Sequence, residues 1–300
     1  MKTAFNCLFL FINFLALGQE DKKLHKILLK EISAFNGEIG IYVKNLKNGR
    51  TVAINADTIF PTASMVKVPI LIGVMDKIQK DELKYNQELV YKDSLLYAGV
   101  DILGSYKTNE KVELGKLVML MLTMSDNTAS LWLQSLAGTG IRINEILDSL
   151  GFKNTRVNSR TPGREKNRSI YGWGQTTPGE MATLFEKIYK NEIISDAACE
   201  RMLRSLARNF WDSHAISEIP PYAQVFSKNG AVDESRSEVL LVNGKKATYV
   251  FCIATKNIKD TSWNNKNEAW VLTKKISRIL WEYFEKNDKW KPAAGQEKFY

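Results

Sequence analysis

The chain has 300 residues, of which 44% are hydrophobic and 25% are charged. These fractions are ordinary for a globular protein and exclude an intrinsically disordered one. The formal net charge is +9, but the lysines are spread along the chain and form no block. We therefore expect weak attraction to anionic surfaces or substrates. No nucleic-acid function is expected, because the sequence contains no recognised binding motif.

The first residues have the layout of a secretory signal peptide. Lys2 gives a positive start, residues 8–17 are nearly all apolar, and Ala16-Leu17-Gly18 ends in small residues. This run is too short to span a bilayer, and no later segment is long and apolar enough to do so. The sequence therefore predicts removal of residues 1–18. Residues 19–300 are expected to form one domain, periplasmic or secreted, with no membrane span.

Cleavage would remove Cys7 and leave Cys199 and Cys252. These two can form a disulfide or remain as buried, unpaired thiols, and the sequence leaves both possibilities open. The chain has two histidines and no cysteine–histidine cluster. A zinc site or a Ser-His-Asp triad is therefore poorly supported, and we expect no metal or organic cofactor.

The predicted elements begin with a helix over residues 21–35, where apolar residues recur at helical spacing. Two alternating segments then flank Asn48-Gly49, a strong signal of a β-hairpin. Helices are predicted over residues 66–78, over the apolar stretch 114–124, and from there to Leu136. The two hairpin strands are residues 38–46 and 51–55.

The second half of the chain has further signals. Thr177 can cap a helix, Pro178 suits its first position, and Glu180 can close a capping box. Two strands are predicted around Asn243-Gly244, at residues 238–242 and 248–254, and an amphipathic helix over 268–284. Strands at both ends with helices between them predict an α+β protein. Its antiparallel sheet would come from both chain ends under covering helices, with an all-helical subdomain inserted at roughly residues 64–205.

Ser64 and Lys67 begin the apolar 66–78 segment. A spacing of three places both side chains on one helix face, within reach of each other. A serine hydroxyl needs a base to become a nucleophile, and lysine can be that base when its surroundings lower its pKa. Pro69 keeps the helix from starting far upstream, so the backbone N–H of Ser64 could bind an oxyanion. Alone, the same pair is typical of a solvated helix surface.

Two more polar motifs follow along the chain. Ser125-Asp126-Asn127 alone is typical of a helix cap, and Lys228-Asn229-Gly230 of a polar turn before a strand. In this order after Ser64-x-x-Lys67, they resemble the penicillin-recognising serine hydrolases, especially the class A β-lactamases, which carry Ser-x-x-Lys, Ser-Asp-Asn and Lys-Thr/Ser-Gly. Ser125 follows Ser64 by 61 residues and Lys228 follows Ser125 by 103, intervals similar to the class A arrangement.

The resemblance implies a β-lactamase/transpeptidase-like fold and covers nearly all of residues 19–300. It implies that Ser64 attacks a carbonyl and forms an acyl-enzyme, while Lys67 accepts its proton. Ser125 would relay a proton to the leaving nitrogen, and Asn127 would orient Lys67 and the substrate amide.

The resemblance also implies roles for the third motif. Lys228 would face the serine from an edge strand and favour an anionic substrate. The backbone N–H groups of Ser64 and Ala231 would form the oxyanion hole. Gly230 would let the substrate lie close against the strand.

Two departures concern substrate binding. Asn229 stands where the family has Thr or Ser, and its larger amide places its donor differently. This puts the contact with a substrate carboxylate in doubt. Arg236 is a candidate to help bind that carboxylate, although a surface arginine near a turn fits the sequence equally well.

A third departure concerns deacylation, for which the class A family uses a glutamate with an asparagine four residues later. The corresponding stretch, residues 161–175, holds one glutamate, Glu165, and Ser169 lies four residues after it. Glu165 is the candidate base for the deacylating water. Its neighbours Arg164, Lys166 and Arg168 are also typical of a solvated charge cluster.

These motifs favour a monomeric β-lactamase that hydrolyses the β-lactam amide through a Ser64 acyl-enzyme. The alternative is a peptidoglycan D,D-peptidase or an esterase-type serine hydrolase of the same fold, with weak β-lactam turnover. Its substrate would be a peptidoglycan-like peptide or an ester. A non-catalytic penicillin-sensing domain is disfavoured because the catalytic motifs are intact and no membrane span follows the signal.

Overall fold

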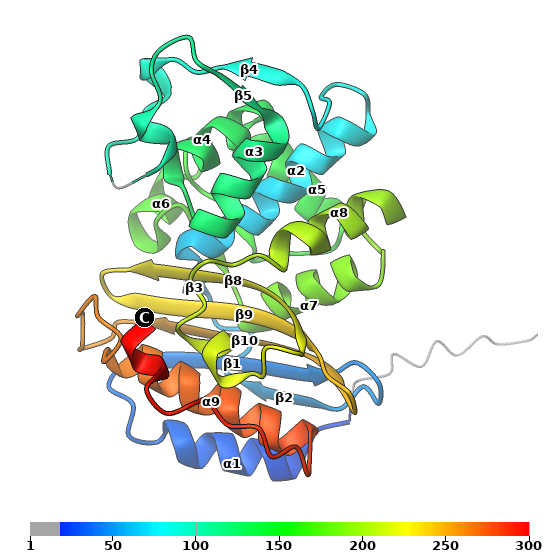
Figure 1. Ribbon diagram of the computed structural model, residues 1–300, viewed down its shortest axis with the longest axis vertical. Coiled ribbons are helices and arrows are strands. Elements are labelled where there is room, and N and C mark those ends of the chain that lie inside the picture. The colour runs from blue at the N-terminus through cyan, green and yellow to red at the C-terminus, as the bar shows by residue number, and fades with distance from the viewer. Residues whose placement is uncertain (1–18, 100, 300) are drawn as a thin grey trace, which may run out of the picture.

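The computed structural model describes residues 19–99 and 101–299, with α+β architecture (Figure 1). The signal peptide predicted over residues 1–18 lies outside the described residues. Within them, no helix combines the length and the apolarity that crossing a bilayer requires.

The central element is a five-stranded antiparallel sheet with the strand order β2-β1-β10-β9-β8. β1, from the start of the chain, pairs with β10, from its end, so that Ile41 lies opposite Ile253. The prediction of a sheet built from both chain ends is therefore confirmed. The strands are β1 (Glu38–Asn45), β2 (Thr51–Ile54), β8 (Gln224–Val232), β9 (Ser235–Asn243) and β10 (Thr248–Lys256).

The β1–β2 hairpin turns at the predicted Asn48-Gly49. Gly49 has φ +71°, a conformation that glycine adopts without steric cost. Lys228-Asn229-Gly230 lies inside β8, as the resemblance implied, and not in a polar turn before a strand. Because β8 is an edge strand, one of its sides is not covered by another strand of the sheet.

Helices cover both faces of the sheet (Figure 1). α1 (Lys22–Ile32) and α9 (Glu268–Phe284) pack on one face, against side chains such as Leu240 and Val242. The remaining helices lie on the other face, where Val239 and Leu241 point. These are α2 (Lys67–Gln79), α3 (Leu114–Met119), α4 (Asn127–Leu136), α5 (Thr139–Ser149), α6 (Glu165–Tyr171), α7 (Pro178–Tyr189) and α8 (Asp196–Leu206).

α2 is the central helix of this helical layer. All of its residues from Lys67 to Asp76 are buried, as expected for a helix that is apolar all round. The predicted 114–124 helix is divided, because α3 ends at Met119 and a π-helical turn covers Leu120–Met124. Short strands complete the layer: β3 (Phe60–Pro61), β6 (Arg156–Val157) and β7 (Gly174–Thr176) form one sheet, and β4 (Glu88–Val90) and β5 (Lys111–Glu113) another.

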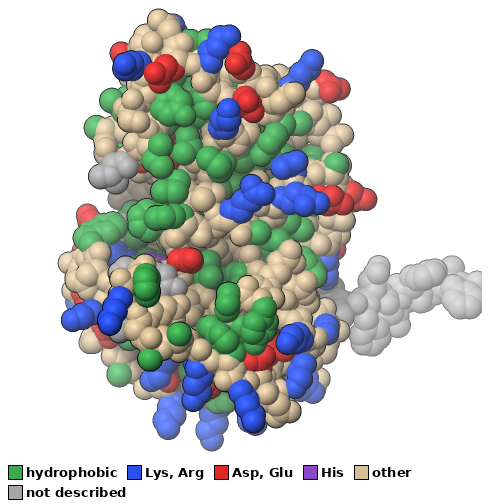
Figure 2. Space-filling view, viewed as in Figure 1, with side chains coloured by type: hydrophobic (Ala, Val, Ile, Leu, Met, Phe, Trp, Pro, Cys, Tyr) green, Lys and Arg blue, Asp and Glu red, His purple; other side chains and the backbone are tan. Residues whose placement is uncertain are grey.

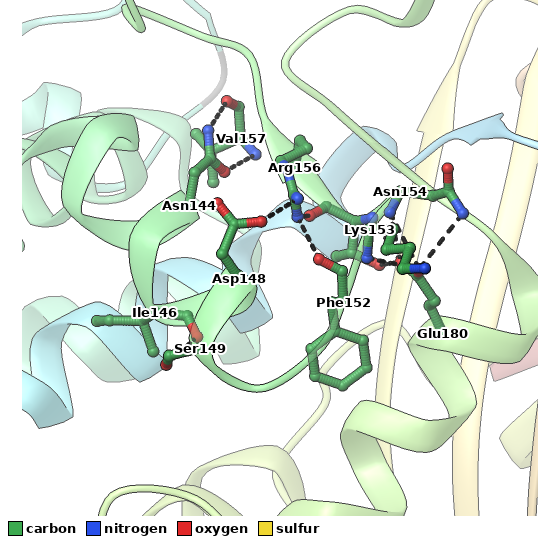
Figure 3. A network of polar contacts seen from close by, with 11 residues as sticks. Asn144, Ile146, Asp148, Ser149, Phe152, Lys153, Asn154, Arg156, Val157 and Glu180 are labelled. Atoms are coloured by element: carbon green, nitrogen blue, oxygen red, sulfur yellow. Dashed lines mark hydrogen bonds and ion pairs between the residues drawn. The ribbon is translucent and has the colours of Figure 1, made fainter.

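The start of α7 is only partly as predicted. Thr177 accepts a hydrogen bond from Glu180 N at 3.1 Å, and Pro178 occupies the first helical position. Glu180 closes no capping box. Its carboxylate instead accepts from the backbone N–H groups of Lys153, Asn154 and Thr155, at 2.6–3.1 Å (Figure 3). Glu180 thereby fixes the segment that leads into β6.

Cys199 and Cys252 are both buried and free. Of the two possibilities that the sequence left open, the structure has the unpaired thiols. The positive charge is distributed over the surface, as expected. Figure 2 shows Lys and Arg side chains along the lower edge of the molecule, where α1 and α9 lie in Figure 1.

Candidate active site

Ser64 lies in a 3-10 turn, Ala63–Val66, that leads directly into α2. Its side chain is partly exposed and can therefore be reached by a substrate. Ala63, just before it, has φ +43°, a conformation that non-glycine residues rarely adopt and that is typical of functional sites. The turn is tied to β7, because Thr62 N donates to Gly174 O at 3.0 Å.

Lys67 connects Ser64 to the second motif. Its Nζ lies 3.0 Å from Ser64 Oγ, 3.0 Å from Ser125 Oγ and 2.9 Å from Asn127 Oδ1, and it also donates to the carbonyl oxygen of Ser125. All of these partners are neutral oxygens. The structure therefore brings together the four side chains that the resemblance grouped.

The environment of Lys67 favours loss of its proton. The side chain is 0% exposed, and burial lowers its pKa from 10.5 to about 7. The negative charges of Asp101 and Asp126 oppose this shift. A lysine with a pKa near 7 exists in both protonation states at neutral pH, which a general base requires.

Ser125 and its neighbours are held by the start of α4. Ser125 itself is in the left-handed conformation, with φ +61°, at the end of the π-helical turn. Asp126 is buried and caps α4: Oδ1 accepts from Ala129 N and Oδ2 from Leu103 N, each at 2.8 Å. Asp126 therefore forms the helix cap that the sequence predicted, while Ser125 and Asn127 of the same triplet contact Lys67.

β8 passes directly beside the serine. A Cβ atom added to Gly230 would lie 2.5 Å from Thr62 O and 2.8 Å from Ser64 N, so only glycine fits. Ala231, next along β8, pairs with Arg236 of β9. Lys228, two residues earlier, is fully buried, and its Nζ donates to the carbonyl oxygen and Oδ1 of Asn229, at 2.9 and 3.1 Å. Burial, followed by repulsion from Lys67, lowers the pKa of Lys228 well below its usual value.

Comparison with known proteins agrees with this geometry. A family model described as the β-lactamase enzyme family matches residues 21–284. The chain belongs to this family. The β-lactamase VEB-1 of Pseudomonas aeruginosa is 22% identical over 267 residues, which are 84% of this chain and 87% of that protein.

Solved structures of PBP-A and of β-lactamases share the fold. PBP-A matches with a TM-score of 0.79 at 24% identity, covering 89% of this chain and 98% of its own, and a mutant of it was solved as an acyl-enzyme complex with penicillin G. A β-lactamase from Chitinophaga pinensis matches with a TM-score of 0.76 at 18% identity, covering 87% and 99%. The predicted β-lactamase/transpeptidase-like fold is confirmed.

The structure corrects the expectation for Arg236. Its side chain lies on the α9 face of the sheet, opposite the face that carries Lys228 and Gly230. The guanidinium donates to five backbone carbonyl oxygens, among them Ser235 O and Ser262 O at 2.9 Å, and its Cζ lies 4.5 Å from the ring centre of Trp263. It is fully buried and faces away from Ser64, so it is not in position to bind a substrate carboxylate there.

The structure also corrects the expectation for Glu165. This residue is exposed at the start of α6, and its carboxylate accepts from Gly163 N at 3.1 Å. Among the residues that the structure describes, no hydrogen bond of Ser64, Lys67 or Ser125 goes to a carboxylate. Within the described residues, the candidate deacylating base therefore forms no hydrogen bond with Ser64, Lys67 or Ser125.

The sequence reasoning missed a loop that lies next to the site, residues 207–214 between α8 and the 3-10 turn Ala215–Glu218. Asn209 Nδ2 donates to Ser227 Oγ at 3.0 Å, and Trp211 Nε1 to Met124 O at 3.0 Å. Loops carry no periodic pattern, so no periodicity in the sequence indicated these contacts. The signal that could have drawn attention to the loop is the aromatic pair Phe210-Trp211 in a mainly polar segment.

Proposed function

We propose that this member of the β-lactamase family is a serine hydrolase that forms an acyl-enzyme at Ser64, with the β-lactam amide as its substrate. The observation that carries the proposal is the position of Lys67 Nζ, 3.0 Å from both Ser64 Oγ and Ser125 Oγ. A fully buried lysine between two hydroxyl groups can take a proton from one and supply it to the other.

The steps follow from these contacts. Ser64 Oγ forms a bond to the substrate carbonyl carbon while its proton passes to Lys67. The carbonyl oxygen becomes an oxyanion, which the backbone N–H groups of Ser64 and Ala231 would bind. The C–N bond then breaks as the Ser125 hydroxyl gives its proton to the leaving nitrogen. Lys67 returns a proton to Ser125, which leaves a serine ester and a neutral lysine.

The third motif would orient the substrate. Lys228 supplies positive potential next to the serine and favours a substrate with a carboxylate. The Oδ1 atom of Asn229 faces Lys228 Nζ at 3.1 Å, so its NH2 group is the part left to donate to that carboxylate. In this proposal the amide replaces the hydroxyl of the family motif as a donor.

A second candidate function follows from the exposed position of Glu165. Without a carboxylate hydrogen-bonded to Ser64, Lys67 or Ser125 among the described residues, the ester at Ser64 would be hydrolysed slowly. A peptidoglycan D,D-peptidase, or an esterase-type hydrolase, with weak β-lactam turnover fits this observation. We also propose that the protein is exported, based on the signal-peptide layout of residues 1–18.

Intact-protein mass spectrometry with a chromogenic cephalosporin tests the proposal and separates its two forms. A brief adduct with continuing colour supports a β-lactamase, and a lasting adduct with a stoichiometric burst supports the peptidase or esterase. Ser64→Ala is expected to abolish the adduct, because no other nucleophile is proposed. Persistent labelling of Ser64→Ala, or no adduct on the wild-type protein, would refute acyl transfer at Ser64.

A further inference from the structure

The loop of residues 207–214 bridges the two elements that carry the second and third motifs. On one side, Phe210 N donates to Thr123 O at 3.1 Å and Trp211 Nε1 donates to Met124 O at 3.0 Å. Met124 O belongs to the peptide group that precedes Ser125. On the other side, Asn209 Nδ2 donates to Ser227 Oγ of β8 at 3.0 Å. The indole of Trp211 is therefore held within one peptide unit of Ser125, in a loop bonded to the strand of Lys228.

This loop presents two aromatic rings to solvent. Phe210 is 57% exposed and Trp211 is 43% exposed. Their ring centres lie 5.3 Å apart at an interplanar angle of 88°, an edge-to-face arrangement that is favourable for aromatic pairs. Trp211 N also donates to Asn209 Oδ1 at 3.0 Å, and Asp212 N to Phe210 O at 3.0 Å. The loop backbone and the Trp211 indole are thus held by hydrogen bonds, which lowers the entropy lost when a ligand covers the rings.

The position of the rings indicates which part of a substrate they would meet. In the proposed mechanism, Ser125 protonates the leaving nitrogen, so the leaving-group half of the substrate lies on the Ser125 side of the serine. The same half would carry the carboxylate that Lys228 attracts. A planar apolar group attached near that carboxylate would be carried toward Trp211 and Phe210.

We propose that Phe210 and Trp211 form an aromatic rim that selects substrates whose leaving-group half carries an aromatic ring beside its carboxylate. The inference rests on the proposed function, because it uses Ser125 to orient the substrate. Stacking between aromatic rings, together with the apolar area covered, corresponds to about a tenfold preference per ring.

Two cephalosporin probes with the same acyl side chain test the rim. One carries an aromatic substituent on the six-membered ring that bears the carboxylate, and the other carries a methyl group there. The second-order rate constant of acylation is measured for each by intact-protein mass. The wild-type protein is expected to prefer the aromatic probe. Trp211→Ala and Phe210→Ala should each lower its rate constant about tenfold and change that of the methyl probe less than about twofold.

Two features keep the outcomes distinct. Phe210 bonds to Thr123 only through its backbone N–H, so Phe210→Ala keeps that contact even if Trp211→Ala disturbs the loop. Trp263, which is 67% exposed and packs against Arg236, is the matched control, and Trp263→Ala should leave both rate constants unchanged. The rim hypothesis would be refuted if both variants lowered the acylation rate constants of the two probes equally, or if neither variant lowered them. Either result would leave the proposed function intact. No acylation of the wild-type protein by either probe would overturn both.

Discussion

Replacing Asn127 with Asp tests whether the protonation of Lys67 controls acylation. Asn127 Oδ1 lies 2.9 Å from Lys67 Nζ, so Asn127→Asp places a carboxylate at that distance from the ammonium with almost no change in shape. An opposite charge this close raises the pKa of a lysine by about one to three units. The pKa of Lys67 would then move from about 7 toward the usual value of 10.5.

The direction of the pH effect follows from the role of Lys67. As the base it must be neutral, so the acylation rate constant of the wild-type protein should rise as the pH increases through about 7. In Asn127→Asp the rise should occur about one to three pH units higher. At pH 7 the variant should therefore be slower by about fivefold or more, and it should recover much of this loss in alkaline buffer.

The assay is the rate of β-lactam adduct formation at saturating probe between pH 5 and pH 10. Asn264→Asp is a matched control, because it makes the same charge change in an exposed loop before α9, where Asn264 Oδ1 accepts from Lys266 N. An unshifted midpoint in Asn127→Asp, with a slower rate at every pH, would indicate damage to geometry only. A flat pH profile in the wild-type protein would refute Lys67 as the base.

Three further predictions concern single positions. Gly230→Ala should lower the rate constant of acylation by at least about a hundredfold, because the added Cβ would lie 2.8 Å from Ser64 N. Circular dichroism should show that the variant is still folded. Normal acylation would mean that β8 does not contribute to the oxyanion site. Glu165→Gln should leave the rates of acylation and deacylation unchanged, as followed by mass spectra over time, because the Glu165 carboxylate accepts a hydrogen bond from Gly163 N instead. Slower deacylation would mean that Glu165 does act on the acyl-enzyme. Glu180→Ala should lower the free energy of unfolding in urea by about 1–3 kcal/mol, since it leaves the N–H group of the buried Thr155 without its partner and releases the more exposed N–H groups of Lys153 and Asn154. The exposed Glu200→Ala on α8 should change it by less than about 0.5 kcal/mol, and equal effects would contradict the anchoring role of Glu180.

The sequence was most informative where the geometry is local. The three-residue spacing of Ser64 and Lys67 predicts side chains on one face, and they are 3.0 Å apart. The Asn48-Gly49 turn and the Thr177 cap were predicted for the same reason, because short segments decide them. The contact between Lys67 and Ser125 joins residues 58 positions apart. Only the resemblance to a family predicted it, because no local rule relates two helices.

The positions of Arg236 and Glu165 show why the direction of two predicted site residues could not be read from the sequence. Residues 235–242 of β9 are all buried, since helices cover both faces of the sheet. Such a strand has no polar alternation that would tell which face Arg236 occupies, and a shift of one residue reverses the answer. Glu165 is the first residue of α6, a short helix that directly follows a loop, so the turns of that loop rather than periodicity decide the direction of its side chain.

The two buried lysines of the site have a common feature that bears on the mechanism. Within residues 19–99 and 101–299, neither Lys67 nor Lys228 forms an ion pair, and both donate to neutral oxygens. A carboxylate partner would hold Lys67 in its charged form, which cannot accept a proton from Ser64. Neutral acceptors satisfy its hydrogen bonds without stabilising the charge to the same degree. In the second candidate function, hydrolysis of the ester is slow because no carboxylate is hydrogen-bonded to these side chains within the described part of the chain. The same lack of a carboxylate therefore helps Lys67 to act as a base. In the proposed mechanism, acylation needs a neutral Lys67 and deacylation needs a carboxylate near Ser64, so the contacts of Lys67 suit the acylation step better than the deacylation step.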